Sequence, residues 1–309
     1  MALIIVMPGF STKSWVSQFR ALDPALDIRV WPDTGAEDEI DFAVTWMHPR
    51  GEFLNYPNLK CIASLGAGVD HILSDPDLPP SVPVTRIIDP SMYHSMSEYV
   101  VMAVLNHCRH FDMYLTNQIH CKWKPKIPIL ARDIRIGVMG LGQLGADAAK
   151  KLVSLGFRVA GWRRTSKKTD NIQTFVGDDQ LTDFLSQTNI LICLLPLTPA
   201  TKDILNCNTF NALQPGAYII NVARGDHLVE SDLLDALESG QLSGACLDVF
   251  RTEPLPEDHP FWRHPKIIVT PHISSLTNPG AVAPQIIESY RRVKSGNSLL
   301  NVVDVERGY

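Results

Sequence analysis

Residues 134–145 read IRIGVMGLGQLG, an apolar run that passes directly into a G-x-G-x-x-G turn. The β-branched residues predict a buried strand, and residues 146–155 predict a helix that Gly156 ends. A strand, a glycine turn and a helix in this order form a dinucleotide-binding unit, with the pyrophosphate at the positive end of the helix. The alternative is an ordinary turn that binds nothing, and the flanking strand and helix favour the cofactor.

The three glycines of this turn have different expected roles. Gly140 permits the tight turn, Gly142 lets the backbone approach a pyrophosphate, and Gly145 lets the helix pack closely on the strand. Gln143 and Leu144, between the last two glycines, are expected to contact the cofactor as well.

The end of the next predicted strand, residues 158–162, indicates which nicotinamide binds. NAD sites usually carry an acid here that bonds the ribose 2′-hydroxyl, but the sequence continues RRTSKK and has no acid before Asp170. A basic cluster on a chain of net charge −5 suits a 2′-phosphate, which a guanidinium grips by two hydrogen bonds. The alternative is a solvated charged loop. We therefore expect NADPH, with NADH weaker, and contacts from Arg163, Arg164 and Ser166.

Length and composition restrict the class of protein. The chain has 309 residues, enough for two domains, with 45% hydrophobic and 20% charged residues. Mild acidity argues against nucleic acid as a partner, and no apolar run is long enough to cross a membrane. The short apolar start predicts a strand rather than a signal peptide. The six cysteines form no C-x-x-C pair, which is typical of reduced core residues and predicts a cytoplasmic protein.

Strands and helices alternate along the chain, which predicts mostly parallel sheets covered on both faces. Ligands bind such sheets beyond the carboxyl ends of the strands. The fold class is α/β, with two doubly wound, Rossmann-like or flavodoxin-like domains and an active-site cleft between them. Strands are expected at residues 3–7, 28–31, 42–45, 61–64, 84–87, 134–139, 158–162, 190–194, 218–221, 245–248 and 267–270, with a first helix at 15–22.

Three helical patterns suggest the domain organisation. Residues 92–115 predict one long helix that crosses from the first domain to the second. Ser231 and Asp232 are expected to cap a helix that Gly240 ends, and the pattern from Pro279 onward returns to the first domain. The histidines and cysteines around residues 107–121 match no common zinc spacing, so no metal is expected. The expected domains are residues 1–97 with 281–309 for substrate and residues 98–280 for NAD(P).

Three predicted strands of the cofactor domain are followed by residues that suit reduction of a 2-oxo acid. Arg224 can hold a substrate carboxylate by two bonds, and His272 can give a proton to the carbonyl oxygen as hydride reaches the carbon. Glu253 can orient the imidazole and favour its protonated form. Each residue alone has an ordinary alternative as a surface, loop or capping residue. The combination favours chemistry.

The turn Gly66-Ala67-Gly68-Val69 follows a strand of the first domain. It presents successive backbone N–H groups with little side-chain bulk, which suits a small carboxylate. Alone, it would more simply be a plain turn. His71 begins a short helix and is expected to be structural.

These segments together resemble the D-2-hydroxyacid dehydrogenase family. The resemblance rests on residues 140–145, 221–225, 253–256 and 271–273 and covers nearly the whole chain. Trp46 and residues 66–73 and 96–100 resemble its glyoxylate/hydroxypyruvate reductase A branch.

The resemblance implies that His272 donates the proton, Glu253 is its partner and Arg224 anchors the substrate. It implies that backbone N–H groups of Ala67, Gly68 and Val69 also hold the carboxylate and that Trp46 lines the pocket. It also implies a homodimer formed through the cofactor domains, and a cleft that closes on the substrate. Further cofactor contacts are expected at Leu195, Pro196, Val222, Ala223 and Asp248.

The predicted function is NADPH-dependent reduction of glyoxylate to glycolate and of hydroxypyruvate to D-glycerate. One alternative is a D-lactate or broader 2-hydroxy acid dehydrogenase. Another is a non-catalytic nicotinamide-sensing module, similar to the C-terminal binding protein corepressors. The absence of long charged tails, and the presence of Arg224, Glu253 and His272 together, favour the enzyme.

Overall fold

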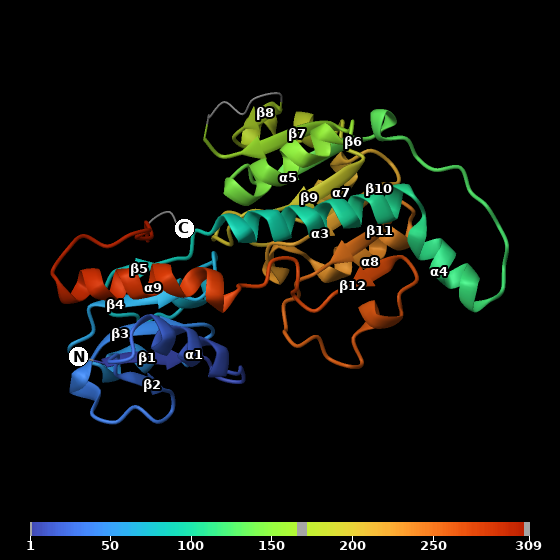
Figure 1. Ribbon diagram of the computed structural model, residues 1–309. Coiled ribbons are helices and arrows are strands. Elements are labelled where there is room, and N and C mark those ends of the chain that lie inside the picture. Colours follow the sequence, from blue (N-terminus) through green and yellow to red (C-terminus); the bar gives the residue numbers. More distant parts are fainter. Residues whose placement is uncertain (1, 166–171, 306–309) are drawn as a thin grey trace. The chain divides into compact units, whose positions relative to one another are not determined.

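The computed structural model describes residues 2–165 and 172–305, and the chain divides into two compact α/β units (Figure 1). Unit 1 comprises Met1–Ser91 and Thr277–Tyr309, and unit 2 comprises Met92–Leu276. The boundaries expected from the sequence, at residues 97 and 281, lie a few residues away. The division into a substrate domain and a cofactor domain, with a cleft between them, stays a prediction.

Unit 1 is built on a parallel five-stranded sheet with the order β2-β1-β3-β4-β5. Its inner strands β1, β3 and β4 are buried along their whole length and mostly apolar, as expected where both faces of a sheet are covered. Helix α9 packs on one face, where the Tyr290 ring lies 5.7 Å from that of Phe42 in β3, so the C-terminal segment returns to unit 1 as predicted. The elements are β1 (Ala2–Val6), α1 (Lys13–Leu22), β2 (Ile28–Val30), β3 (Ile40–Thr45), β4 (Cys61–Ser64), α2 (Asp70–Leu73), β5 (Val84–Thr85) and α9 (Pro279–Lys294).

Unit 2 is built on a parallel seven-stranded sheet with the order β12-β11-β10-β9-β6-β7-β8. The chain runs outward from β6 in one direction and then returns to continue from β9 in the other. The switch point of this topology therefore lies beside β6, where ligands of such sheets bind. The elements are α3 (Pro90–Cys108), α4 (Phe111–Ile119), β6 (Arg135–Met139), α5 (Gln143–Ser154), β7 (Arg158–Arg163), β8 (Gln173–Val176), α6 (Leu181–Leu185), β9 (Ile190–Cys193), α7 (Cys207–Ala212), β10 (Ala217–Asn221), α8 (Glu230–Glu238), β11 (Leu242–Leu247) and β12 (Ile267–Val269).

Short 3₁₀ helices complete the described elements. They are η1 (Glu37–Glu39), η2 (Glu52–Asn55), η3 (Ala131–Asp133), η4 (Asp178–Gln180), η5 (Gly225–His227) and η6 (Pro260–Arg263).

The sheet of unit 2 has a separate apolar core on each face. Along β9, Leu191 and Cys193 face the core that includes residues of α6, α7 and α8, whereas Ile190 and Ile192 face the core that includes residues of α3 and α5. Side chains alternate between the faces of a strand, so a strand buried on both faces must be apolar throughout. This requirement explains the continuous apolar runs in the sequence. Within the described residues, no helix is both long and apolar enough to span a membrane.

The prediction that Gly156 ends the helix after the glycine turn, α5, is confirmed. Gly156 has φ +88°, a left-handed conformation that favours glycine. The N–H of Gly156 donates to Val153 O at 2.9 Å and that of Phe157 to Leu152 O at 3.2 Å. These two bonds satisfy the last carbonyls of α5 and turn the chain into β7.

The single helix predicted over residues 92–115 is wrong. Helix α3 ends at Cys108, and α4 begins after His110, whose φ is 55°. The N–H of Ile129 donates to the carbonyl of Cys108 at 3.0 Å, so a later segment supplies a partner at the helix end. Local patterning contains no sign of this long-range bond.

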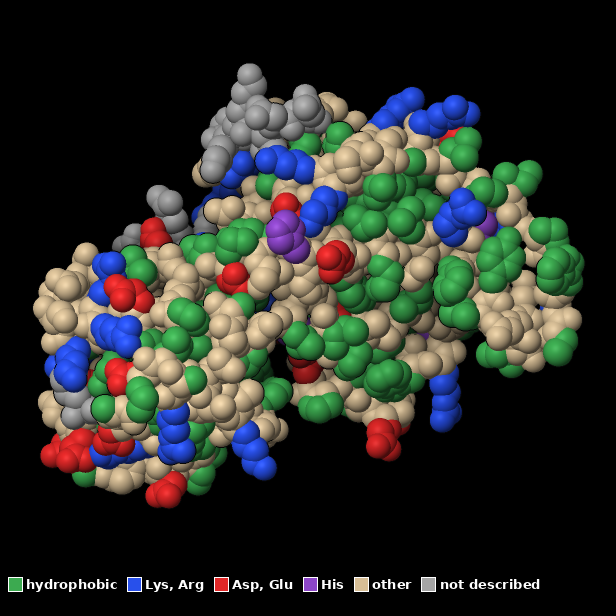
Figure 2. All heavy atoms as spheres, in the orientation of Figure 1, with side chains coloured by type: hydrophobic (Ala, Val, Ile, Leu, Met, Phe, Trp, Pro, Cys, Tyr) green, Lys and Arg blue, Asp and Glu red, His purple; other side chains and the backbone are tan. Residues whose placement is uncertain are grey.

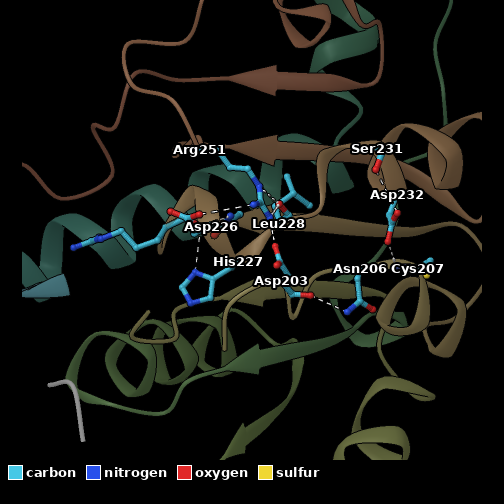
Figure 3. Close-up of polar contacts among 11 residues, drawn as sticks. Asp203, Asn206, Cys207, Asp226, His227, Leu228, Ser231, Asp232 and Arg251 are labelled. Atoms are coloured by element: carbon cyan, nitrogen blue, oxygen red, sulfur yellow. Dashed lines mark hydrogen bonds and ion pairs between the residues drawn. The ribbon is translucent and has the colours of Figure 1, made fainter. Parts of the chain in front are cut away.

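The predicted cap of α8 is also wrong. The helix begins at Glu230 without a side-chain cap, which places Ser231 and Asp232 inside its first turn. The Asp232 carboxylate instead accepts the N–H of Cys207, at 2.7 Å, at the start of α7 (Figure 3). Gly240 does follow the end of α8, with φ +80°.

The strand expected at residues 84–87 is shorter in the structure. It ends at Thr85, and the N–H of the next residue, Arg86, bonds to Asn301 O.

Candidate active site

The carboxyl edge of the unit 2 sheet brings together most of the candidate residues of this unit. Because all seven strands are parallel, the segments that follow β6, β9, β10, β11 and β12 all lie at this edge. They contain the glycine turn, Leu195 and Pro196, Val222 to Arg224, Asp248, and His272.

The glycine turn after β6 has the geometry that the sequence predicts. Gly140 has φ +99°, and a Cβ there would lie 2.5 Å from Leu194 O. A Cβ at Gly145 would lie 1.9 Å from Gly140 O, so the close packing of α5 requires glycine at that position. A Cβ at Gly142 would meet no atom of the described residues within 4 Å. Among those residues no side chain caps α5, which leaves its first N–H groups open to an anion such as a pyrophosphate.

The basic end of β7 lies beside this turn. The N–H of Gly140 donates to Trp162 O at 2.9 Å, which places the following residue, Arg163, next to the turn. The Trp162 ring is buried, and its N–H donates to Gly177 O at 2.8 Å. Arg163 is half-buried and Arg164 is exposed. Ser166, the third predicted phosphate contact, lies outside the described residues.

His272 and Glu253 form a hydrogen-bonded pair at the same edge. The imidazole Nδ1 lies 2.8 Å from Glu253 Oε2, and both side chains are about one-third exposed. The other oxygen, Oε1, accepts the N–H of Phe250 at 2.9 Å. Burial raises the pKa of the Glu253 carboxyl, but His272, the Phe250 N–H and the charge of Arg224 outweigh it, so the pKa is lowered. An ionised carboxylate is therefore held against the imidazole.

Asp248 holds the segment that carries His272. In that segment His272 has φ 53°, a left-handed backbone conformation that is uncommon outside glycine. The fully buried Asp248 carboxylate accepts the Thr270 hydroxyl at 2.6 Å and the N–H groups of Ile273 and Ser274 at 2.9 and 2.8 Å. Its carbonyl accepts the N–H of His272 at 2.8 Å. These bonds fix the histidine backbone, and the expected contact of Asp248 with the cofactor stays a prediction.

Tyr99 of α3 supports the same segment and was missed by sequence reasoning. Its hydroxyl lies 2.5 Å from Thr270 Oγ1. Because Thr270 gives its hydrogen to Asp248, the Tyr99 hydroxyl donates to Thr270. Burial is the main cause that raises the pKa of Tyr99, so it stays protonated. In the sequence this tyrosine lies in a helical pattern and in the segment 96–100 that carries part of the resemblance, but nothing there assigns it a role.

A buried asparagine shapes the loop that carries Arg224. Asn221 Oδ1 accepts the N–H of Ala223 at 3.2 Å, and its Nδ2 donates to Arg224 O at 2.9 Å. A Cβ at Gly225 would lie 1.9 Å from the carbonyl carbon of Phe250, so this loop packs against the backbone that leads to Glu253. Unit 2 therefore brings the guanidinium, the carboxylate and the imidazole to neighbouring loops.

Arg251 fixes the chain just beyond Arg224 (Figure 3). Its Nε and Nη2 donate to the carbonyl of Leu228 at 2.8 and 2.6 Å. The same guanidinium forms ion pairs with Asp203 and, at 3.8 Å, with Asp226. Arg251 is therefore a structural residue of this loop.

In unit 1, the expected substrate residues form one cluster. The Trp46 ring lies 4.5 Å from that of His71, and a Cβ at Gly66 would lie 2.6 Å from Trp46 Cζ3. Ser64 Oγ accepts the N–H of Gly66 at 3.1 Å and donates to Gly68 O at 2.8 Å, which fixes the turn.

The described part of the chain contains no group of three or more His, Cys, Asp or Glu side chains placed to bind a metal ion.

A glycine turn at the switch point of a parallel sheet, with a histidine–carboxylate pair at the same edge, defines a dinucleotide-dependent oxidoreductase. Comparison with known protein families identifies the family within this class. The chain belongs to the D-isomer specific 2-hydroxyacid dehydrogenases, because the model of their NAD-binding domain matches residues 101–274, and full-length relatives support it.

Two of these relatives are named glyoxylate/hydroxypyruvate reductase A. The proteins of Serratia proteamaculans and Photorhabdus laumondii are each 43% identical to this chain over 314 aligned positions, covering 100% of both chains.

Solved structures give the same result for the fold. A D-isomer specific 2-hydroxyacid dehydrogenase from Xanthobacter autotrophicus, in complex with NADPH and MES, is 41% identical and superposes with a TM-score of 0.93 over 100% of this chain and 99% of its own. An NADPH-dependent glyoxylate/hydroxypyruvate reductase from Sinorhizobium meliloti, in complex with NADP and sulfate, is 36% identical with a TM-score of 0.92 and the same coverage. The α/β fold class and the family predicted from the sequence are confirmed.

Proposed function

We propose that this protein reduces glyoxylate to glycolate and hydroxypyruvate to D-glycerate with NADPH. The observation that carries the proposal is the His272–Glu253 pair at the carboxyl edge of the sheet, on loops that adjoin the Arg224 loop. Two relatives named for these substrates align along their whole length, and two related structures hold NADPH or NADP.

In the proposed mechanism, each of the three side chains has one task. Arg224 holds the substrate carboxylate by two parallel hydrogen bonds. NADPH, once bound, would supply the hydride that C2 of the substrate receives. His272 donates a proton to the carbonyl oxygen from Nε2, since Nδ1 lies against Glu253, and later regains a proton from solvent. Glu253 stabilises the imidazolium before the transfer.

The remaining site assignments are proposals of the same kind. Trp46 and the backbone of Ala67, Gly68 and Val69 contribute to substrate binding, which the fixed turn under the Trp46 ring supports. The cofactor is held by Gly140, Gly142, Gln143, Leu144, Gly145, Arg163, Arg164, Ser166, Leu195, Pro196, Val222, Ala223 and Asp248, of which all but Ser166 lie in the described part of unit 2.

A labelled cofactor tests the function. NADPH that carries deuterium in the transferable position at nicotinamide C4 should give glycolate labelled at C2 and labelled D-glycerate from hydroxypyruvate. Equal or better turnover of pyruvate would favour the broader dehydrogenase. Tight NADPH binding without any labelled product would favour a nicotinamide-sensing module and contradict the enzyme.

The arginines at the end of β7 are expected to select the cofactor. Replacing Arg163 and Arg164 by glutamine should raise the Kd for NADPH about 10–100-fold, because a charge-assisted hydrogen bond contributes about 1.5–3 kcal/mol. The Kd for NADH should change little, and fluorescence titration measures both constants. Arg158→Gln, at the exposed start of the same strand, is the matched control. Equal weakening of both cofactors would mean that the pair does not contact the 2′-phosphate.

The pH dependence of the reaction should reveal the partner of His272. Glu253→Gln removes the charge that favours the protonated imidazole and keeps an acceptor for the Phe250 N–H. Because the lowered pKa of Glu253 keeps it ionised at neutral pH, its loss should reduce kcat/KM more at neutral and alkaline pH than at acid pH. Glu257→Gln, an exposed acid of the same loop, should leave the profile unchanged. A Glu253→Gln profile parallel to that of the wild type would rule out the pairing.

We also propose that the protein forms a homodimer through unit 2. Helix α4 and the segment after it expose large apolar side chains, which Figure 2 shows gathered on this part of the molecule, and Ile119, Trp123 and Ile127 are 80%, 100% and 88% exposed. Apolar patches of this kind mark protein interfaces. Sedimentation should give twice the chain mass of 34.4 kDa, and replacing Trp123 and Ile127 by serine should release the single chain. A wild-type chain that sediments alone would contradict the dimer.

A cytoplasmic location is proposed as well. All six cysteines are free thiols, and four of them are buried, as expected for a reducing compartment.

A further inference from the structure

His227 is a completely buried histidine in a position that the proposed chemistry does not use. It ends η5, two residues beyond the Arg224–Gly225 pair, and its exposed fraction is 0%. Histidine is seldom buried so completely, and a buried polar ring needs hydrogen-bond partners. Both ring nitrogens of His227 lie near backbone carbonyls.

The two carbonyls belong to different loops at the carboxyl edge of the sheet. Nδ1 lies 3.1 Å from the carbonyl of Arg224, in the loop after β10, and Nε2 lies 3.4 Å from that of Pro196, in the loop after β9. Each carbonyl has a second donor within its own loop: Asn221 Nδ2 for Arg224 and Thr201 Oγ1 for Pro196. The imidazole is therefore the side chain that connects two separately braced loops.

The backbone around His227 strengthens this connection. Its carbonyl accepts the N–H of Leu205 at 2.8 Å, and the carbonyl of Asp226 accepts the N–H of Asp203 at 2.9 Å. The segment that continues from Pro196 is thus bonded to η5 at three places, twice through main chain and once through the imidazole. The main-chain N–H of His227 also donates to the Arg224 carbonyl, at 3.3 Å, whereas the contact with Pro196 comes from the imidazole.

We propose that His227 is a positioning residue that holds the Arg224 loop and the Pro196 loop in fixed relation to each other. The inference rests on the proposed function, in which Arg224 binds the substrate carboxylate and the Pro196 loop binds the cofactor. His227 touches neither ligand. Because a carbonyl oxygen only accepts, the neutral ring, with its single N–H, donates either to Arg224 or to Pro196, and each of its two tautomers braces one of the two loops.

Two amide side chains separate the two contacts. Asparagine places a donor near the position of Nδ1, and glutamine places one near Nε2. His227→Asn should keep the bond to Arg224 and lose the contact to Pro196, so the Kd for NADPH rises while the KM for glyoxylate at saturating NADPH is retained. His227→Gln should keep the contact to Pro196 and lose the bond to Arg224, so the KM for glyoxylate rises while the Kd for NADPH is retained. Each loss should be about 2–10-fold, the usual contribution of one neutral hydrogen bond.

A control variant separates positioning from general loss of stability. Thr188→Val removes a buried hydroxyl that donates to Phe184 O at 2.8 Å, just before β9 and therefore at the opposite, amino-terminal edge of the sheet. It should lower the melting temperature and leave both constants unchanged. The proposal would be overturned if each His227 variant raised both the Kd for NADPH and the KM for glyoxylate, or if neither variant changed either constant.

The wild-type protein provides a second measurement that does not depend on the variants folding. NADPH alone should slow amide hydrogen exchange in the segment Asp226–Leu228 as well as in the Pro196 loop, because the two are linked. Protection confined to the Pro196 loop would overturn the link. Neither NADPH Kd nor hydrogen exchange requires turnover. Absence of any 2-oxo acid reduction would therefore defeat the proposed function, whereas the loop link would still be decided by these two measurements.

Discussion

Replacing His272 by alanine should lower kcat for glyoxylate about 10²–10⁴-fold, the usual effect of removing a general acid. The Kd for NADPH should not change, because the glycine turn and the basic end of β7 that are proposed to hold the cofactor are separate from the histidine loop. Stopped-flow or steady-state rates give kcat, and fluorescence titration gives the Kd. The expected result is an enzyme that binds its cofactor and does not turn over.

A second variant removes the ambiguity of backbone strain. His272 has φ 53°, which alanine tolerates poorly and asparagine tolerates better. His272→Asn should therefore keep the melting temperature closer to that of the wild type and lose kcat to the same extent. His264→Ala, before β12, is the control and should remain active. Substantial kcat in both His272 variants would show that another group donates the proton.

Arg224→Lys should raise the KM for glyoxylate and hydroxypyruvate about 10–100-fold. Lysine keeps the charge but is a point donor, so it cannot form two parallel bonds with a carboxylate, and each charge-assisted bond contributes about 1.5–3 kcal/mol. The Kd for NADPH should be unaffected, because the guanidinium is assigned to the substrate. Initial rates over a range of substrate concentrations at saturating NADPH measure the effect.

The control for this substitution is another arginine-to-lysine change in the same unit. Arg263, exposed in η6, has no assigned role, and Arg263→Lys should leave the KM unchanged. An Arg224→Lys enzyme with the wild-type KM would exclude Arg224 as the anchor. A fall in kcat at unchanged KM would instead assign Arg224 to the transition state alone.

The parts of the fold that could be predicted from sequence depend on local physics. The glycine turn, the helix end at Gly156 and the buried strands follow from backbone freedom and apolar runs, and the structure confirms them. The order of the strands then places the turn, Arg224 and His272 at one edge, because parallel strands share their carboxyl ends.

The parts that sequence reasoning missed depend on partners far along the chain. Helix α3 ends where Ile129 bonds to Cys108, and Asp232 serves α7 rather than its own helix. Tyr99 supports the histidine loop through Thr270, a residue 171 positions away. His227 likewise bonds to a loop 31 positions earlier. Periodicity and capping rules concern neighbours in sequence, so such residues carry no local signal.

The most direct test of the central claim is a panel of initial rates with NADPH and NADH against glyoxylate, hydroxypyruvate and pyruvate. We expect steady NADPH oxidation with glyoxylate and hydroxypyruvate, slower rates with pyruvate, and weaker use of NADH throughout. Tight binding of NADPH with no oxidation by any of the three acids would contradict the assignment of Arg224, Glu253 and His272 to a reductase site.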